Sequence, residues 1–436
     1  MDTIFALATA PGRAALAVMR LSGPQSRSML AGLGVRIPTA RRASLRHLRD
    51  GKGRVLDEAI VLWLPGPRSY TGEDSVELHL HGGRAVVESV GEALVALGAR
   101  PAEPGEFTRR AVLNGRMDLT AAEGVIDLIE AETAAQARQA LRLAGGKLAA
   151  LCDGWSGRLA TLLARQEAMI EFEDEWLPSS LDAQVLAMIT ELANEMAGRL
   201  EEDAGAERIR DGLDVAILGA PNAGKSSLLN ALVGRDAAIV SARAGTTRDI
   251  VEARTVLAGL PAVLADTAGL REAGDEIEAE GVRRALHRGE GADIVIAVLA
   301  HGAPPDEATL ELIARRDCVV VAGKSDLGGE LPEGFPEEAI PVSARTGEGL
   351  ERLRDRLETE ATLLAPVSGS VLLTRPRHRA AIRDTLRCLR EAENALLAEL
   401  RADALREALR ALGRLTGRVG AEAILDRVFS EFCIGK

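Results

Sequence analysis

Aromatic residues are scarce in this chain, and positive charge is outweighed by negative charge. Phe, Trp and Tyr together make up 2% of the 436 residues, and the formal net charge is −12 at pH 7. Proteins that coat nucleic acid use a basic surface or aromatic side chains that stack on bases. The composition excludes that class, so any contact with RNA must come from a local basic patch or from a partner.

Cysteines and long apolar runs are also scarce. The four cysteines are Cys152, Cys318, Cys388 and Cys433, and they form no Cys-x-x-Cys pair, so neither a zinc site nor a disulfide framework is indicated. The sequence contains no apolar run of the roughly 20 residues that span a bilayer. Asp2 stands where a secretory signal would carry positive charge. We therefore expect a cytoplasmic chain without a membrane segment.

Changes of pattern along the chain predict several domains, because 436 residues exceed the roughly 150 typical of one domain. Short apolar runs predict strands at 4–8, 16–19, 59–64 and 76–80. We expect a small α/β domain at 1–118, a helical domain at 119–212, a P-loop α/β domain at 213–365 and a second helical stretch at 366–436. The two helical stretches would form one all-α domain into which the P-loop domain is inserted.

A phosphate-binding loop is the strongest local motif. A buried strand is predicted at 214–218, and Gly-Ala-Pro-Asn-Ala-Gly-Lys-Ser follows at 219–226, before an apolar helical pattern. Backbone N–H groups of such a loop and the helix N-terminus bind phosphate. Lys225 would reach the β- and γ-phosphates, and the Ser226 hydroxyl would bind Mg²⁺. Further nucleotide contacts are expected at Asn222, Ala223, Gly224 and Ser227.

The elements that follow stand in the order that a GTPase requires. Thr247, in Gly-Thr-Thr-Arg-Asp at 245–249, is the predicted second Mg²⁺ ligand. Asp266 ends a predicted strand and would act on the Mg²⁺ shell, and the Gly269 N–H would contact the γ-phosphate. Asp326 can accept hydrogen bonds from two guanine donors, which adenine does not offer in that arrangement. The other contacts expected in these motifs are at Thr246, Thr267, Ala268, Lys324, Ser343, Ala344 and Arg345, the last three by backbone contact with the guanine carbonyl.

Two positions depart from the usual GTPase pattern. Gly323 stands where Asn usually precedes Lys-x-Asp, which removes an amide that would bond both the base and the phosphate loop. Guanine preference then depends on Asp326. Leu270 follows Gly269, so the glutamine that orients water in many small GTPases is absent. Another group must organise hydrolysis.

Motifs outside the GTPase region resemble the bacterial and organellar family of tRNA-modifying GTPases called MnmE or TrmE. They are Tyr-Thr-Gly-Glu-Asp-Ser-Val-Glu-Leu-His-Leu-His-Gly-Gly at 70–83, Pro-Gly-Glu-Phe-Thr at 104–108, Leu-Asn-Gly-Arg-Met-Asp-Leu at 113–119 and Cys-Ile-Gly-Lys at 433–436. The resemblance implies an N-terminal folate-binding and dimerising domain, a helical domain and an inserted GTPase. It also implies a homodimer that joins a flavin-dependent MnmG-type partner in a heterotetramer and modifies C5 of the tRNA wobble uridine.

The resemblance further implies ligands for the N-terminal domain and a role for a thiol. A 5-formyltetrahydrofolate-type ligand would contact Arg20, Glu77, Arg116, where the family commonly has Lys, and Lys436. Arg in place of Lys keeps the charge but changes the geometry of that contact. Cys433 is either a reactive thiol or a packed small residue.

In the GTPase region the resemblance implies paired GTPase domains with K⁺ near the place where an arginine finger would put positive charge. The matching positions are Asn222, Ser241, Arg243 through its backbone carbonyl, and Thr246. Glu278 matches the acid that orients the attacking water, although it also lies in an acidic stretch that could simply be solvated. The catalytic set is then Glu278, Lys225 and Gly269.

Several alternatives stay open at this stage. An RNA-binding regulatory GTPase of the ribosome-assembly kind would need an appended RNA-binding module, and we find none beside the GTPase motifs. A folate-dependent one-carbon enzyme with GTP as a regulator is a third function. The arginines at 406, 410, 414 and 418 form either a solvated helix face or a contact for the tRNA backbone. His79 and His81 point to one strand face, where hydrogen bonding is favoured over metal binding.

Overall fold

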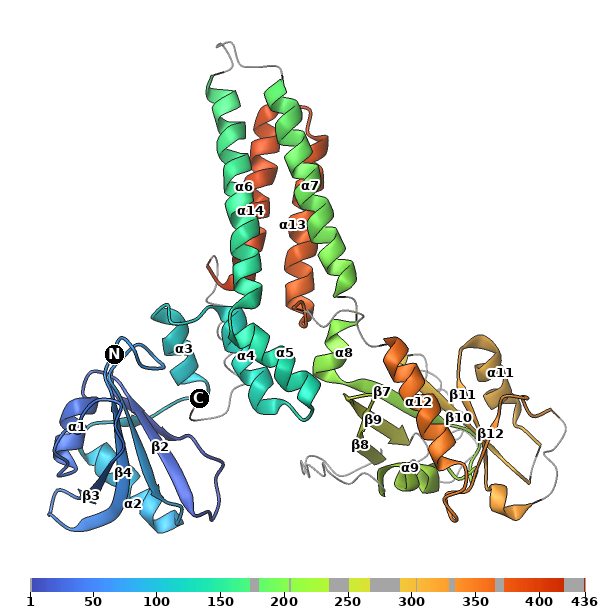
Figure 1. Cartoon of the computed structure of the whole chain (residues 1–436), viewed down its shortest axis with the longest axis horizontal. Helices are drawn as coiled ribbons and strands as arrows, with labels where there is room; N and C mark the ends of the chain where they lie inside the picture. Colours follow the sequence, from blue (N-terminus) through green and yellow to red (C-terminus); the bar gives the residue numbers. More distant parts are fainter. Residues whose placement is uncertain are drawn as a thin grey trace, which may run out of the picture. The chain divides into compact units, whose positions relative to one another are not determined.

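The structure, a computed structural model, describes residues 2–172, 180–203, 205–234, 251–266, 291–302, 304–328, 334–364, 372–418 and 435. It contains two six-stranded sheets and a bundle of long helices (Figure 1). The chain divides into two compact units, Met1–Ile126 with Arg142–Ala193 and Ala381–Lys436, and Asp127–Leu141 with Asn194–Ala380. The predicted fold class of α/β domains combined with an all-α part is confirmed. None of the described helices is long and apolar enough to cross a membrane.

The first sheet has the strand order β3-β4-β5-β2-β1-β6 and belongs to the first unit. Its strands are β1 (Ile4–Leu7), β2 (Leu16–Ser22), β3 (Ser44–Arg49), β4 (Val55–Leu64), β5 (Ser75–His81) and β6 (Arg100–Pro101). Alternate residues of β5, such as Leu78 and Leu80, are fully buried against α1 (Ser26–Gly32) and α2 (Arg84–Ala96). Because side chains alternate along a strand, Glu77 and His79 lie on the opposite face.

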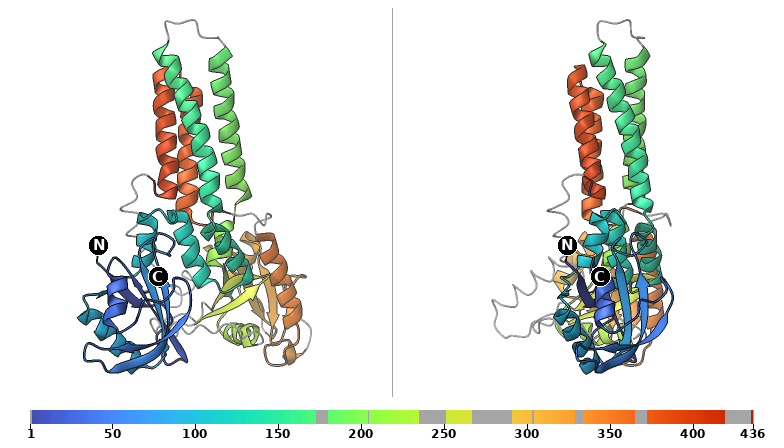
Figure 2. Two further views of the ribbon diagram at one scale, coloured as in Figure 1. Left: turned by 60° about the vertical axis from the view of Figure 1, so that its left-hand side comes forward. Right: turned by 90° about the vertical axis from the view of Figure 1, so that its left-hand side faces the viewer.

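A bundle of helices is built from two segments that are far apart in sequence. Its members are α6 (Lys147–Glu171), α7 (Ser180–Glu202), α13 (Pro376–Asn394) and α14 (Ala398–Thr416). Helices α6 and α14 pack along each other, as both views in Figure 2 also show. The Thr190 hydroxyl on α7 reaches Glu393 on α13 at 2.5 Å. The shorter α3 (Glu106–Leu113), α4 (Leu119–Glu130) and α5 (Ala134–Ala144) precede the bundle.

The second sheet has the strand order β12-β11-β10-β7-β9-β8 and lies in the second unit. Its strands are β7 (Leu213–Leu218), β8 (Val251–Leu257), β9 (Leu260–Asp266), β10 (Ile294–Ala300), β11 (Val319–Gly323) and β12 (Ile340–Val342). Among the strand pairs that the structure describes in this sheet, β8–β9 is antiparallel and the others are parallel. The residues of β10 are apolar throughout and almost all buried, as expected for a parallel strand covered on both faces. The carboxyl ends of the parallel strands therefore share one edge, where ligands of such sheets bind.

Helices and a short turn of the second unit lie between residues 206 and 364. They are α8 (Ala206–Asp211), α9 (Lys225–Gly234), α11 (Glu307–Arg315), α12 (Leu350–Leu364) and the 3₁₀ turn η1 (Ser325–Leu327). The two ends of this segment of chain lie together. The guanidinium of Arg208, in α8, donates to the carbonyl oxygen of Leu364, the last residue of α12, at 3.4 Å. Just before α8, the Asp203 carboxylate accepts the backbone N–H groups of Leu372 and Leu373 at 3.0 and 2.8 Å.

Candidate nucleotide-binding site

The loop between β7 and α9 has the backbone geometry of a phosphate-binding loop. Gly219 has φ +148°, and a Cβ there would lie 2.2 Å from the Val298 carbonyl oxygen, so no larger residue fits. Asn222, at the exposed tip of the loop, has φ 60°, a left-handed conformation that Asn tolerates. The glycine therefore holds the loop close to β10 while α9 begins directly behind it.

Lys225 is folded back over this loop. Its ammonium donates to the carbonyl oxygens of Gly219 and Ala220 at 2.8 and 2.7 Å, and the residue is buried. Burial lowers the pKa of Lys225, and the nearby Asp266 and Asp306 carboxylates oppose that shift. The amino group thus lies at the centre of the loop, where phosphate oxygens would replace the two carbonyl partners.

Ser226 and Asp266 meet beside the loop. The Ser226 hydroxyl, in the first turn of α9, donates to a carboxylate oxygen of Asp266, which ends β9 and is buried. A hydroxyl and a carboxylate in contact fit Mg²⁺, which takes oxygen ligands and completes its shell with water and phosphate oxygens. Among the described residues no group of three or more His, Cys, Asp or Glu side chains forms a metal site on its own. Phosphate oxygens, with Thr247 as the predicted second protein ligand, would complete a Mg²⁺ site here.

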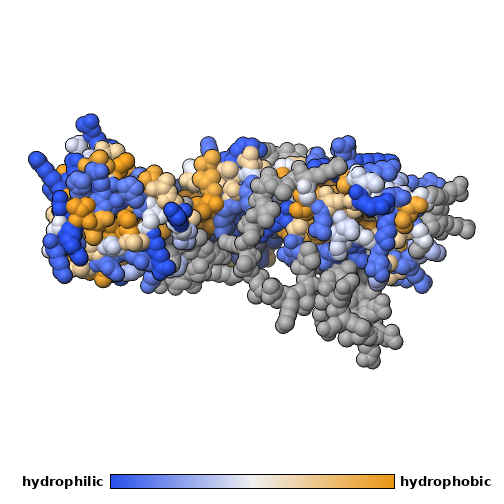
Figure 3. Space-filling model, turned by 90° about the horizontal axis from the view of Figure 1, so that it is seen from below, coloured by the Kyte–Doolittle hydropathy of each residue, from blue (hydrophilic) through white to orange (hydrophobic). Residues whose placement is uncertain are grey.

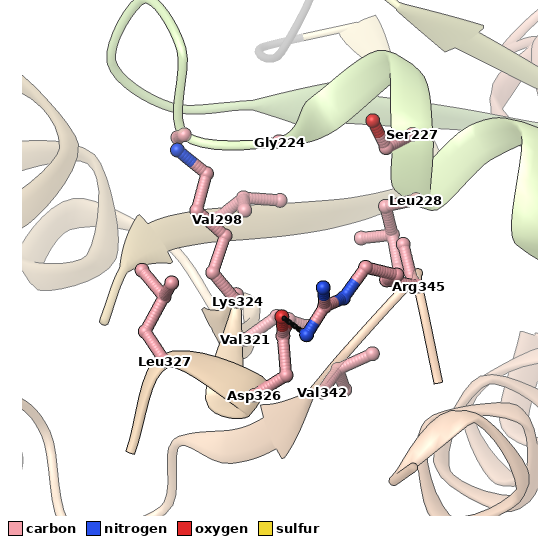
Figure 4. Close-up of a pocket in the computed structure, with 13 residues that line it drawn as sticks. Gly224, Ser227, Leu228, Val298, Val321, Lys324, Asp326, Leu327, Val342 and Arg345 are labelled. Carbon is pink, nitrogen blue, oxygen red and sulfur yellow. Dashed lines mark ion pairs between the residues drawn. The ribbon is translucent and has the colours of Figure 1, made fainter. Parts of the chain in front are cut away.

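A carboxylate lies at the other end of the same sheet edge. Asp326, in η1 after β11, accepts a hydrogen bond from the Ser343 hydroxyl at 2.8 Å through Oδ1. Its Oδ2 pairs with Arg345 Nη2 at 2.9 Å (Figure 4). The hydrogen bond from Ser343 lowers the pKa of Asp326, and the charge of Arg345 lowers it further. An ionised acceptor therefore lies where the sequence predicts guanine recognition.

A cavity of about 220 Å³ connects the phosphate loop with this carboxylate. Its floor is apolar and includes Val298, Val321 and Val342 from the carboxyl ends of β10, β11 and β12. Lys324, with φ 63°, extends along the cavity toward the phosphate loop (Figure 4). An apolar cavity with polar groups at its end suits a purine base.

Many predicted nucleotide contacts come together at this site. Those that the structure describes are Asn222, Ala223, Gly224, Lys225, Ser226, Ser227, Asp266, Lys324, Asp326, Ser343, Ala344 and Arg345. Other predicted site residues lie outside the described residues, namely Ser241, Arg243, Thr246, Thr247, Thr267, Ala268, Gly269, Glu278, Cys433 and Lys436. Sequence reasoning missed the valine floor and the side-chain contacts of Ser343 and Arg345. Apolar strand ends were the only available signal for the floor.

The predicted folate residues of the N-terminal domain are only partly brought together. Arg20 and Glu77 face each other on β2 and β5, with Nη2 and Oε1 2.8 Å apart. The Arg20 guanidinium also lies 5.3 Å from the centre of the Tyr70 ring. Beside Glu77, the buried Nε2 of His79 has no hydrogen-bond partner among the described residues. An aromatic ring, the Arg20–Glu77 pair and the His79 ring nitrogen, which lies 3.6 Å from Glu77 Oε2, fit a polar heterocyclic ligand. The Arg116 side chain lies beside Gly72.

A buried ionic cluster supports this part of the domain. Arg110 donates to Glu106 Oε1 at 2.8 Å and to Glu73 Oε2 at 3.1 Å, and Arg100 donates to Glu106 Oε2 at 2.8 Å. Burial alone would raise the pKa of Glu106. Hydrogen bonds from Arg100, the Glu103 N–H and Arg110 instead hold that pKa at about 2. The cluster fixes α3 to the loop that carries Glu73.

Three arginines of the predicted stripe form ion pairs within the protein, Arg406 and Arg410 on α14 and Arg418 just after its end. Arg406 pairs with Glu167 at 2.9 Å, Arg410 pairs with Glu407, and Arg418 pairs with Asp153 at 2.7 Å. These partners neutralise much of the stripe and favour a solvated, ion-paired face over a phosphate contact.

His81 Nδ1, on β5, lies 2.7 Å from Asp57 Oδ1, which confirms hydrogen bonding for that histidine.

Known proteins match the chain over its whole length. A model of the MnmE helical domain matches residues 119–433, and a model of the GTP-binding protein TrmE N-terminus matches residues 3–116. The tRNA modification GTPase MnmE of Granulibacter bethesdensis is 52% identical over 100% of this chain and 99% of that protein. The protein of the same description from Gluconacetobacter diazotrophicus is 54% identical over 99% of this chain and 98% of its own length. That from Paramagnetospirillum magneticum is 50% identical over 100% of both chains.

Proposed function

Because this chain belongs to the MnmE family of tRNA modification GTPases, we propose that it hydrolyses GTP in a K⁺-stimulated cycle within tRNA modification. With a flavin-dependent MnmG-type partner, it would take part in (carboxymethyl)aminomethyl modification at C5 of the wobble uridine. The chain is a GTPase that acts in tRNA modification, as its family membership implies. The observation that carries the proposal is the pairing, across one cavity, of the Lys225 loop with the Asp326 carboxylate.

Different side chains would bind the base, the phosphates and the Mg²⁺ ion of the nucleotide. The ionised Asp326 accepts the N1–H and N2–H groups of guanine, and the backbone at Ala344 meets the base carbonyl. Lys225 moves from the carbonyl oxygens of its own loop to the β- and γ-phosphates. Ser226 and Thr247 would hold Mg²⁺, with Asp266 acting on its shell, and the bound ion would neutralise phosphate charge.

Hydrolysis would depend on a cation site and on an acid. We assign K⁺ to Asn222 together with Ser241, the Arg243 carbonyl and Thr246 of a second motif. The exposed, left-handed position of Asn222 supports this assignment, because its side chain lies on the outer side of the loop. Glu278 would orient the attacking water in place of the missing glutamine. These roles presuppose that two GTPase domains pair across a homodimer.

The N-terminal domain would bind folate and form the dimer. The folate, of the 5-formyltetrahydrofolate type, would contact Arg20, Glu77, Arg116 and Lys436. Apolar side chains gather on the surface of this part of the chain (Figure 3), and exposed apolar residues of its strands include Leu16, Leu45 and Ile60. An exposed apolar sheet face supports a protein contact. We propose a cytoplasmic location for the protein and domain bounds at 1–118, 119–212, 213–365 and 366–436.

The decisive experiment compares GTP hydrolysis in KCl and NaCl at equal ionic strength. We expect turnover to be roughly tenfold or more faster in KCl, because positive charge at the transferred phosphate stabilises the transition state. Asn222→Ala should remove that difference. Asn394→Ala, an exposed amide of α13, should keep it.

Light scattering follows the oligomer in the same salts, with GDP alone and with GDP plus aluminium fluoride. The dimer should tighten in K⁺ with the transition-state mimic. Equal turnover in both salts by a monomer would contradict the potassium assignment and favour a regulatory GTPase of another kind.

A further inference from the structure

An arginine side chain forms an ion pair with Asp326, the carboxylate that would accept hydrogen bonds from guanine. Arg345, two residues after Ser343 at the end of β12, points its guanidinium into the cavity toward Asp326 (Figure 4). Its Nη2 lies 2.9 Å from Oδ2 of Asp326. The Arg345 side chain is 78% exposed, whereas that of Asp326 is 14% exposed. The carboxylate is fixed in the cavity, and the arginine reaches it from solvent.

The base and the arginine offer the carboxylate the same chemical group. The N1–C2–N2 edge of guanine is a guanidine fragment, with N–H donors on two nitrogens joined through one carbon. A guanidinium presents that fragment with a full positive charge, and carboxylates bind it in the same planar manner. Since Ser343 already holds Oδ1 at 2.8 Å, Oδ2 is the oxygen for which guanine and Arg345 must compete.

We propose that Arg345 is a built-in competitor for the guanine site, which pairs with Asp326 when no nucleotide is bound and must leave before the base can enter. This inference rests on the proposed function, in which Asp326 recognises guanine. Only the fraction of molecules with the pair open can then bind nucleotide, so the apparent affinity is reduced by that fraction. The competition lowers the association rate of the nucleotide, because the Arg345–Asp326 pair must open before the base enters. It leaves the dissociation rate unchanged, because the pair is open in the nucleotide complex.

Arg345→Gln tests this proposal in the full-length protein. GDP affinity is measured by calorimetry with Mg²⁺, and association by stopped flow with a ribose-labelled fluorescent GDP. We expect GDP to bind about 2- to 6-fold more tightly than to the wild type, the range that an exposed ion pair supports. The gain should appear in the association rate. Arg345→Lys, which keeps the charge but lacks the planar fork, should give a smaller gain.

A salt series tests whether the competition is ionic, and a control variant tests whether it is specific to Arg345. The ratio of wild-type to variant dissociation constants should fall toward one at high salt, because exposed charges are screened. Arg352→Gln changes an exposed arginine of α12 in the same domain and should leave GDP binding unchanged.

Two outcomes overturn the proposal in different ways. If Asp326→Ala weakens GDP binding while Arg345→Gln leaves it equal or weaker, Arg345 does not compete and the guanine site stands. If Asp326→Ala leaves GDP binding intact, the assignment of the guanine site fails, and the competition fails with it.

Discussion

Replacing Asp326 by Asn should move the base preference from guanine toward xanthine. The Ser343 hydroxyl donates to Oδ1 at 2.8 Å, so the amide oxygen of the new side chain takes that position. The amide NH₂ then faces the cavity where Oδ2 faced it before. This NH₂ group would face the N2 amino group of guanine, and two donors cannot form a hydrogen bond with each other. The C2 carbonyl oxygen of xanthine, in contrast, would accept a hydrogen bond from it.

The size of the change follows from two opposing effects. Loss of a hydrogen bond to a charged acceptor weakens GDP binding by roughly 10- to 100-fold. Loss of the competing Arg345 pair strengthens GDP binding by about 2- to 6-fold, because exposed ion pairs are weak. We therefore expect GDP to bind to the variant roughly 2- to 50-fold more weakly than to the wild type, and xanthosine diphosphate to bind to it more tightly than to the wild type.

Calorimetry with GDP and xanthosine diphosphate measures both shifts, and turnover of GTP and xanthosine triphosphate measures their effect on hydrolysis. Asp317→Asn, an exposed carboxylate before β11, is the matched control and should change neither affinity. The reasoning is refuted if Asp326→Asn binds GDP as the wild type does, or if xanthosine diphosphate gains nothing.

Two further predictions concern Gly323 and Glu106. A Cβ at Gly323 would lie 3.0 Å from the Ala223 carbonyl oxygen, so Gly323→Ala should weaken GDP binding. Gly323→Asn should bind GDP about 2- to 10-fold more tightly than the alanine variant by regaining an amide hydrogen bond, and equal dissociation constants would contradict this. Glu106→Gln should destabilise β1 and β2 by about 1–3 kcal/mol at pH 7 in amide hydrogen exchange. Because the folded pKa of about 2 is below the unfolded value, this loss should shrink as pH falls from about 4.5 toward 2, and a pH-independent loss would contradict it.

Local pattern predicts much of the fold because buried strands and the phosphate loop have short-range signatures. The loop at 219–226 lies between β7 and α9 as predicted, and the apolar runs of the N-terminal domain form β1, β2, β4 and β5. Strand β3 was not predicted. It is an edge strand whose residues Ser-Leu-Arg-His-Leu-Arg contain two apolar side chains, since much of it faces solvent.

Contacts between separate segments could not be predicted in the same way. The sequence indicated a backbone role for Ser343 and Arg345, yet both side chains reach Asp326 across 17 and 19 positions of the chain, respectively. Such contacts depend on the parallel pairing of β11 with β12, which places the loops after these strands side by side. Nothing in the residues around either motif specifies that register.

The meeting of the two chain ends beside α8 and α12 has a consequence for how the protein is built. The Arg208 contact with Leu364, and that of Asp203 with Leu372 and Leu373, bring the start and finish of the second sheet's segment together. Once this segment is folded, its two ends are as close as the ends of a short loop. Bringing the flanking helices together across the segment therefore costs little chain entropy. The helical domain can thus accept the GTPase segment at one point of its chain, because the segment leaves and re-enters close to the same place.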